Sequence, residues 1–201
     1  GYNEAAALAA ERATVTALMG AHLGLASVQL SQGNHDGARA NLAHVDEVGA
    51  GVGLSPTHPQ RVTRLWLAGR LALATGDATG AQAAFQAAID AAPQQASAMM
   101  ARLGLAEAAL SRGESTTAID LARAARTQAA HLQGGKPRSF RTAIAEVVCA
   151  RALAAAGQIE AARREATDAL EHLAATVDPS HPDIATATRL AGGTQKPPAA
   201  N

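Results

Sequence analysis

The sequence predicts an all-α fold of antiparallel helical hairpins, and three observations support this prediction. Alanine makes up roughly a quarter of the 201 residues, aromatic residues make up 2% and β-branched residues are few, a composition that favours helices over strands. A glycine followed five residues later by an alanine recurs four times along the chain. Each of these glycines stands between two helical apolar runs, so each repeat is expected to form one hairpin.

The recurring glycines are separated by 43, 37 and 44 residues, an interval that holds two helices of about a dozen residues and their turns. Each glycine can take the left-handed conformation at the end of a first helix, and the polar residue after it can begin the second helix. Small residues stand where paired helices would pack most closely. The glycines are Gly33, Gly76, Gly113 and Gly157; the polar residues are Asn34, Asp77, Glu114 and Gln158; the small residues are Ala26, Gly69, Ala106 and Ala150 on first helices and Ala38, Ala81, Ala118 and Ala162 on second helices.

Two further segments resemble each other, "SPTHPQRVTRLWLAG" at 55–69 and "DPSHPDIATATRLAG" at 178–192. Proline is favoured as the first residue of a helix, because its missing N–H would be unpaired there and its φ is already helical. We therefore interpret both segments as helix starts in which the histidine is the cap, and Asp183 as a carboxylate at the positive end of the helix dipole. The capping histidines are His58 and His181, and the first helical residues are Pro59 and Pro182.

The same signals give a helix map and a domain organisation. We predict helices at 4–18, 20–32, 35–48, 59–75, 78–91, 95–112, 115–131, 139–156, 159–175 and 182–191. They form a single repeat domain over 1–192, with units near 19–52, 59–93, 96–132 and 139–176 and a half-repeat at 182–192. The first predicted helix, 4–18, would be the second half of a preceding unit, and 193–201 would be a disordered C-terminal tail.

The second unit, "LWLAGRLALATGDATGAQAAFQAAIDAAP" at 65–93, resembles the tetratricopeptide repeat (TPR) family at Gly69, Gly76, Ala81 and Phe85. The longer period is similar to the kinesin-light-chain-like subclass found in bacterial multidomain signalling proteins. The resemblance implies a right-handed α-solenoid of about four hairpins with flanking half-repeats. In the other units Leu42, Ala122 and Ala166 replace the aromatic residue of the family.

Charge and cysteine content exclude several function classes. Lys+Arg and Asp+Glu are balanced at 17 each, so neither nucleic acid nor a membrane is an expected partner. No apolar run is expected to be long enough to cross a bilayer, and the start "GYNEAA" indicates a piece of a longer protein. The single cysteine, Cys149, fits a reducing compartment, so we expect a cytoplasmic protein.

We find no motif for catalysis, for a cofactor or for a metal, and expect none of the three. Phosphate loops, dinucleotide fingerprints and nucleophile elbows are missing from the sequence. A weak divalent-metal site is the alternative at His35 with Asp36 and at His44 with Asp46 and Glu47, but a solvated helix face is the stronger interpretation. Cys149 stands on an apolar face, which indicates a buried and inert thiol.

The family register implies a concave groove lined by the first helices, suited to a protein or peptide segment. In this register Arg70, Glu107 and Arg151 follow one another on successive hairpins, where they would pair together or grip a charged partner. Trp66 is the best single candidate for a partner contact, and packing between hairpins is the alternative role for this side chain. The nine predicted groove residues are Ser27, Thr63, Trp66, Arg70, Met100, Leu103, Glu107, Val147 and Arg151.

These observations predict a noncatalytic protein–protein interaction scaffold, the TPR region of a larger bacterial signalling or regulatory protein such as a serine/threonine kinase. The alternative is a ligand- or peptide-sensing regulatory domain of a transcriptional activator. A homodimer through the ends of the solenoid is a further possibility, because helices at the ends of a solenoid have one face without a neighbouring repeat.

Overall fold

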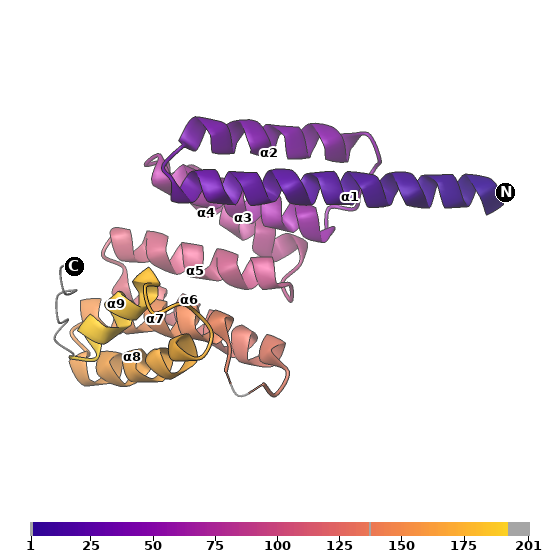
Figure 1. Cartoon of the computed structure of the whole chain (residues 1–201). Coiled ribbons are helices and arrows are strands. Elements are labelled where there is room, and N and C mark those ends of the chain that lie inside the picture. The colour runs from indigo at the N-terminus through magenta and orange to yellow at the C-terminus, as the bar shows by residue number, and fades with distance from the viewer. Residues whose placement is uncertain (1, 137, 193–201) are drawn as a thin grey trace, which may run out of the picture. The chain divides into compact units, whose positions relative to one another are not determined.

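The computed structural model describes residues 2–136 and 138–192, with side chains from residue 10 onward, and these residues form nine helices and no strand (Figure 1). The prediction of an all-α fold is confirmed, whereas the predicted tail at 193–201 lies outside the described residues. The helices are α1 (Tyr2–Ser31), α2 (His35–Ala50), α3 (Pro59–Ala74), α4 (Ala78–Ala91), α5 (Ala96–Ser111), α6 (Ser115–Gln133), α7 (Phe140–Ala155), α8 (Ile159–Ala174) and α9 (Pro182–Leu190).

The chain divides into two compact units, the first ending at Ala101 and the second beginning at Arg102, within α5. In the first unit α1 packs on α2 and α3 packs on α4, and α3 also contacts both helices of the preceding hairpin. In the second unit α7 packs on α6 and on α8, and α9 contacts α7 and α8. Within each unit, helices that follow one another in sequence therefore pack as in a TPR solenoid.

The turns inside the hairpins form as their glycines predict. Gly33, Gly76, Gly113 and Gly157 have φ of 73°, 81°, 78° and 75°, the left-handed region that suits glycine at the end of a helix. The side chains of Asn34 and Asp77 then cap the second helices by accepting from the N–H of Gly37 at 3.0 Å and of Gly80 at 2.8 Å.

The cap prediction needs one correction. Glu114 and Gln158 stand at the cap positions of α6 and α8, but neither side chain makes a capping hydrogen bond. The reason is length, because a side chain one methylene longer than that of aspartate or asparagine does not fold back as readily on the first turn. Glu114 instead binds the guanidinium of Arg112 at 2.7 Å.

The two His-Pro segments begin helices as predicted. His58 Nδ1 accepts from the N–H of Gln60 at 3.3 Å, and His181 Nδ1 accepts from the N–H of Asp183 at 3.3 Å. Pro59 and Pro182 are the first residues of α3 and α9. The shared motif is therefore a helix start that is used once in each unit.

The predicted break between residues 18 and 20 is wrong, because α1 is one continuous helix of 30 residues. Gly20 lies within it, and its φ is not left-handed. A glycine inside a helix costs only about 1 kcal/mol, and here no proline or capping residue adds a stop signal. Met19, which is 1% exposed, packs in the core with Leu42 and Val45 of α2 and holds this part of α1 in register. The first predicted helix is thus not a separate half-repeat.

The close-packing positions are buried as predicted. Ala26, Ala106 and Ala150 on first helices are fully buried. At Gly69 the fit is closest, since a Cβ placed there would lie 2.5 Å from the ring of Phe85 on α4. Phe85 itself is fully buried and fills the centre of the α3–α4 hairpin.

Candidate partner-binding surface

In the first unit, α3 presents Trp66 and Arg70 one helical turn apart. The Arg70 guanidinium carbon lies 5.4 Å from the centroid of the Trp66 ring, a cation–π arrangement. Both side chains are half-buried, and one part of Trp66 packs against the core formed by α1, α2 and α3. The exposed remainder is a rigid aromatic and guanidinium surface of the kind that dominates binding energy at protein interfaces.

The other predicted groove residues of the first unit are also half-buried. Thr63 on α3 and Ser97 on α5 bind each other through their hydroxyl groups at 2.7 Å. Ser27 on α1 and Met100 on α5 are half-buried as well. The groove role of Ser27, Thr63 and Met100 stays a prediction.

In the second unit, Glu107 on α5 and Arg151 on α7 form an ion pair at 2.9 Å, with the side chains 46% and 43% exposed. The pairing predicted for successive hairpins is therefore present between these two residues. Arg70 lies over Trp66 instead, an arrangement that charge alternation did not predict. A pair this exposed stabilises the fold by less than about 1 kcal/mol, so both groups stay available to another charged molecule.

Two of the nine predicted residues are not on the surface. Leu103 is 4% exposed and Val147 is 3% exposed. Val147 packs with Ala143 of α7 and with Ala169 and Leu173 of α8. The register assigned their row to the groove, but on α5 and α7 this row points into the packed interior. Leu103 and Val147 are core residues, and we do not retain them as surface candidates.

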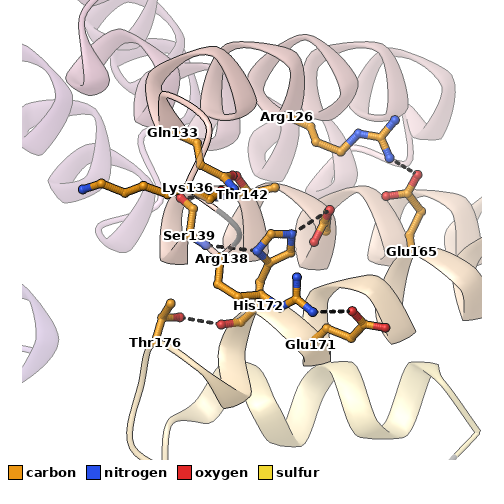
Figure 2. A network of polar contacts seen from close by, with 11 residues as sticks. Arg126, Gln133, Lys136, Arg138, Ser139, Thr142, Glu165, Glu171, His172 and Thr176 are labelled. Atoms are coloured by element: carbon orange, nitrogen blue, oxygen red, sulfur yellow. Dashed lines mark hydrogen bonds and ion pairs between the residues drawn. The ribbon is translucent and has the colours of Figure 1, made fainter.

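The second unit also has a buried polar network that the sequence analysis missed (Figure 2). His172 on α8 accepts from the backbone N–H of Ser139 at 3.0 Å through Nδ1. Its Nε2 lies 4.0 Å from a carboxylate oxygen of Glu146, a residue that is 6% exposed. Next to this pair, Arg126 binds Glu165, and Thr142 donates to Gln133 at 2.8 Å. The sequence signal was a single glutamate in the apolar run "IAEVVCA".

Burial shifts the titration of both groups. Burial, and then the carboxylates of Glu165 and Asp168, raise the pKa of Glu146 to about 7. Burial also lowers the pKa of His172 below its usual range. One oxygen of Glu146 and one of Glu165 are buried without a hydrogen-bond partner among the described residues. The network therefore holds a carboxyl group that is about half protonated at pH 7.

The acidic and histidine clusters considered for metal binding are engaged with neighbours. His44 contacts Glu47 at 3.1 Å, Asp36 binds Arg39 and Asp46 binds Arg64. Among the residues that the structure describes, no group of three or more potential metal ligands comes together. Cys149 is buried, and burial raises the pKa of its thiol to about 11, which keeps it in the unreactive protonated form.

A cleft of about 500 Å³ opens in the first unit between α2, α3 and α4. Its walls combine apolar side chains with charged groups. Arg61 donates to the carbonyl of Gly49 at 3.2 Å, and Arg64 pairs with Asp46 at 2.5 Å. The remaining lining includes Met19, Val45, Leu65, Ala87 and Ala91.

Part of α1 is long and apolar enough to pass a membrane-span criterion. Ala10–Ser31 has 22 residues and a mean hydropathy of 1.3, so the statement that no apolar run has this length is wrong. The hydropathy comes from leucine, alanine and valine, which are also frequent in the helices of packed proteins. Met19, Leu23 and Ala26 of this segment are buried against α2. Length and composition alone are therefore weak evidence for a membrane.

Comparison with known proteins supports the repeat assignment. The tetratricopeptide repeat family model matches residues 67–132. No curated protein matches the sequence.

Two solved structures have a similar fold. One is a Podosopora anserina protein described as having kinesin light chain nearly identical TPR-like repeats, with a TM-score of 0.60, 20% identity, and coverage of 86% of this chain and 86% of that chain. The other is a substituted form of the same protein, with a TM-score of 0.60, 20% identity, and coverage of 86% and 85%. At this identity the likeness concerns the fold alone. The chain therefore contains a tetratricopeptide repeat region, and its fold is similar to that of kinesin-light-chain-like TPR repeats.

Proposed function

We propose that this chain is a noncatalytic protein–protein interaction scaffold that binds a protein or peptide segment through the exposed face of its first helices. TPR domains generally bind proteins and are typically noncatalytic. The observation that carries the proposal is the Trp66–Arg70 pair, a partly exposed aromatic ring under a guanidinium group on α3. The Glu107–Arg151 pair offers a second, charged contact in the other unit.

We further propose that the scaffold is part of a larger, bacterial, cytoplasmic signalling or regulatory protein, such as a serine/threonine kinase. The support is the resemblance of the repeats to those of such proteins and the single buried cysteine, which suits a reducing compartment.

A capture experiment tests the scaffold function. The chain is immobilised, exposed to extracts of the source organism, and the retained proteins are quantified by mass spectrometry for the wild type and for Trp66→Ala and Arg70→Ala. We expect at least one protein to be retained by the wild type and to fall about tenfold or more with Trp66→Ala. Retention of the same proteins by both variants would exclude this surface.

Two controls separate binding from folding. Trp66 packs partly on the core, so Trp66→Phe keeps an aromatic ring there and is expected to restore stability and part of the binding. Ile159→Ala removes an apolar side chain that is 50% exposed on α8 and is not part of the proposed surface. It is expected to leave capture unchanged.

The cleft in the first unit favours a second candidate function, a regulatory domain of a transcriptional activator that senses a small ligand or peptide. Arg61 and Arg64 would bind an anionic group, and the apolar walls would hold an attached hydrocarbon part. Such a ligand would raise the melting temperature by mass action. A screen of carboxylates and short peptides by thermal shift, with Arg61→Ala as the control variant, tests this function; no shift with any compound would count against it.

A further inference from the structure

One face of α1 exposes aliphatic side chains in a regular stripe. Leu18, Leu25 and Val28 are 46%, 52% and 53% exposed. Ala21 lies between them and is also exposed. The spacing of three and four residues places the four side chains on one side of the helix. We call this stripe the α1 face.

The repeat register identifies the residues of α3 and α7 that are equivalent to the α1 face. The residues of the α1 face stand 15, 12, 8 and 5 positions before Gly33. At the same positions before Gly76 and Gly157, the side chains of α3 and α7 lie against the helix that precedes them. The equivalents are Arg61, Arg64, Ala68 and Leu71 on α3, and Thr142, Ala145, Cys149 and Ala152 on α7.

The contacts of these equivalents are direct. Ala68 and Leu71 pack in the same core as Leu42 of α2, and Arg64 binds Asp46 of α2. On α7 all four equivalents are 5% exposed or less, and Thr142 donates to Gln133 of α6 at 2.8 Å. The α1 face is therefore the counterpart of an interface that two later hairpins complete.

The described part of the chain does not cover this face itself. Residues 2–17 continue along the axis of α1, so they do not fold back over Leu18 and Leu25. Figure 1 shows α1 extending well beyond the end of α2, which has 16 residues against the 30 of α1. A helix from outside the described residues would complete the interface.

We propose that a second copy of the chain binds here, so that the protein forms a symmetric dimer through α1. The charge distribution favours a copy as the occupant. From Ala13 to Asn34 the sequence has no Asp, Glu, Lys or Arg, so two such faces meet without like charges. A two-fold axis requires one self-complementary surface, and the α1 face combines one small residue, Ala21, with three larger aliphatic ones.

An antiparallel register fits these residues. With the axis near residue 23, Ala21 of one copy lies opposite Leu25 of the other, and Leu18 lies opposite Val28. Near the axis the small side chain of Ala21 then faces Leu25, whereas farther out Leu18 faces Val28, so the two helices approach most closely at the axis. Ala17 and Gly24 flank the stripe and are also exposed, so they allow a close approach.

A membrane is the competing occupant, because Ala10–Ser31 passes the span criterion. Insertion would however remove Met19, Leu23 and Ala26 from the core that they share with α2. It would also break the contact of His22 Nδ1 with Asn41 at 2.8 Å. Docking of a copy keeps all of these contacts, so it is the occupant that the structure favours.

Sedimentation velocity of the full 201-residue chain over a range of concentrations tests the proposal. We expect the wild type to have twice the mass of the chain and to dissociate on dilution. Leu25→Glu should give the single mass at every concentration, because it would bury a carboxylate opposite Ala21. Ile159→Glu, at a residue 50% exposed on α8, is the matched control and should behave as the wild type.

Folding and membrane binding are measured in the same experiment. Far-UV circular dichroism checks that each variant folds, and Ala21→Glu replaces Leu25→Glu if the Leu25→Glu protein is unfolded. Vesicles of phosphatidylcholine with phosphatidylglycerol are co-sedimented with the wild type in parallel. A single mass for the wild type, with or without vesicle binding, would overturn the proposal, as would a dimer that both glutamate variants leave intact.

Discussion

The hairpins α3–α4 and α7–α8 share one repeat register and fill their interiors differently. In α3–α4 the close-packing position is Gly69, and the ring of Phe85 occupies the space that a side chain would take. In α7–α8 the equivalent pair is Ala150 and Ala166, both fully buried, and the same interior includes the carboxyl group of Glu146. The comparison indicates that both hairpins keep the position at which their two helices pack most closely. The size and polarity of the side chains that fill the interior differ between the two hairpins.

The largest expected effect on stability comes from removing the aromatic ring of Phe85 in α3–α4. Phe85→Ala should reduce the free energy of unfolding by about 3–5 kcal/mol, because it leaves a cavity beside a glycine that cannot fill it. Urea unfolding followed by circular dichroism measures this change. Ile159→Ala, which removes an exposed side chain, is the control. A loss for Phe85→Ala no larger than that of the control would mean that the ring does not hold the hairpin together.

The second prediction adds volume at the same contact. Gly69→Ala would place a Cβ 2.5 Å from the Phe85 ring, and we expect a net loss of about 1–3 kcal/mol from overpacking although alanine favours the helix. In the background of Phe85→Leu the loss should shrink, which a double-mutant cycle measures. If Gly69→Ala stabilises the protein in both backgrounds, the close contact is not a constraint.

The reverse substitution in α7–α8 completes this comparison. Ala150→Gly should reduce the free energy of unfolding by about 1 kcal/mol, because it lowers helix propensity and creates only a small void. The two hairpins would thus respond to opposite changes at one register position. If neither Gly69→Ala nor Ala150→Gly changed the free energy of unfolding, the two hairpins would not differ in packing at this position.

The third prediction concerns the buried carboxyl group of α7–α8. Because the pKa of Glu146 is raised from 4.5 to about 7 in the folded state, the folded protein holds this proton at pH values where the unfolded chain has released it. Its contribution to stability therefore falls as the pH rises from about 4.5 to above about 7. Glu146→Gln should abolish this dependence and be more stable than the wild type at pH 8, by on the order of 1–2 kcal/mol.

His172 provides the internal control for that experiment. Burial lowers its pKa, so the unfolded chain takes up a proton first, and stability should fall as the pH drops below about 6.5. Glu146→Gln should keep this acid limb, since it does not remove the imidazole. Stability curves measured by urea unfolding across the pH range would refute the assignment if wild type and Glu146→Gln had parallel slopes between about pH 4.5 and 7.

The sequence was sufficient to predict those features that depend on interactions between neighbouring residues. The left-handed glycines such as Gly76, the cap by Asp77 and the helix start at His58 and Pro59 depend on a few consecutive residues. Such short-range signals predict the hairpins and their order. The same signals predict that Trp66 and Arg70 lie one turn apart on one helix.

The sequence was insufficient where distant segments decide the outcome. The continuity of α1 through Gly20 depends on packing of Met19 against α2, and no local stop signal separates the two possibilities. The burial of Val147 depends on Leu173, which lies on another helix. The network of Glu146 and His172 joins residues 26 positions apart, so a glutamate in an apolar run shows only that a partner is needed.

The smallest expected effect is at the surface, where the two units treat an equivalent arginine differently. Arg70 lies over Trp66, whereas Arg151 pairs with Glu107. Because the pair is nearly half-exposed, Glu107→Gln should reduce the free energy of unfolding by only about 0.2–1 kcal/mol at low salt, and by less at 1 M salt, where the Debye length is about 3 Å. Thermal unfolding at two salt concentrations measures the difference. A salt-independent loss of several kcal/mol would show that the pair is part of the fold; the expected small loss would leave Glu107 and Arg151 free to serve a charged partner at little cost to stability.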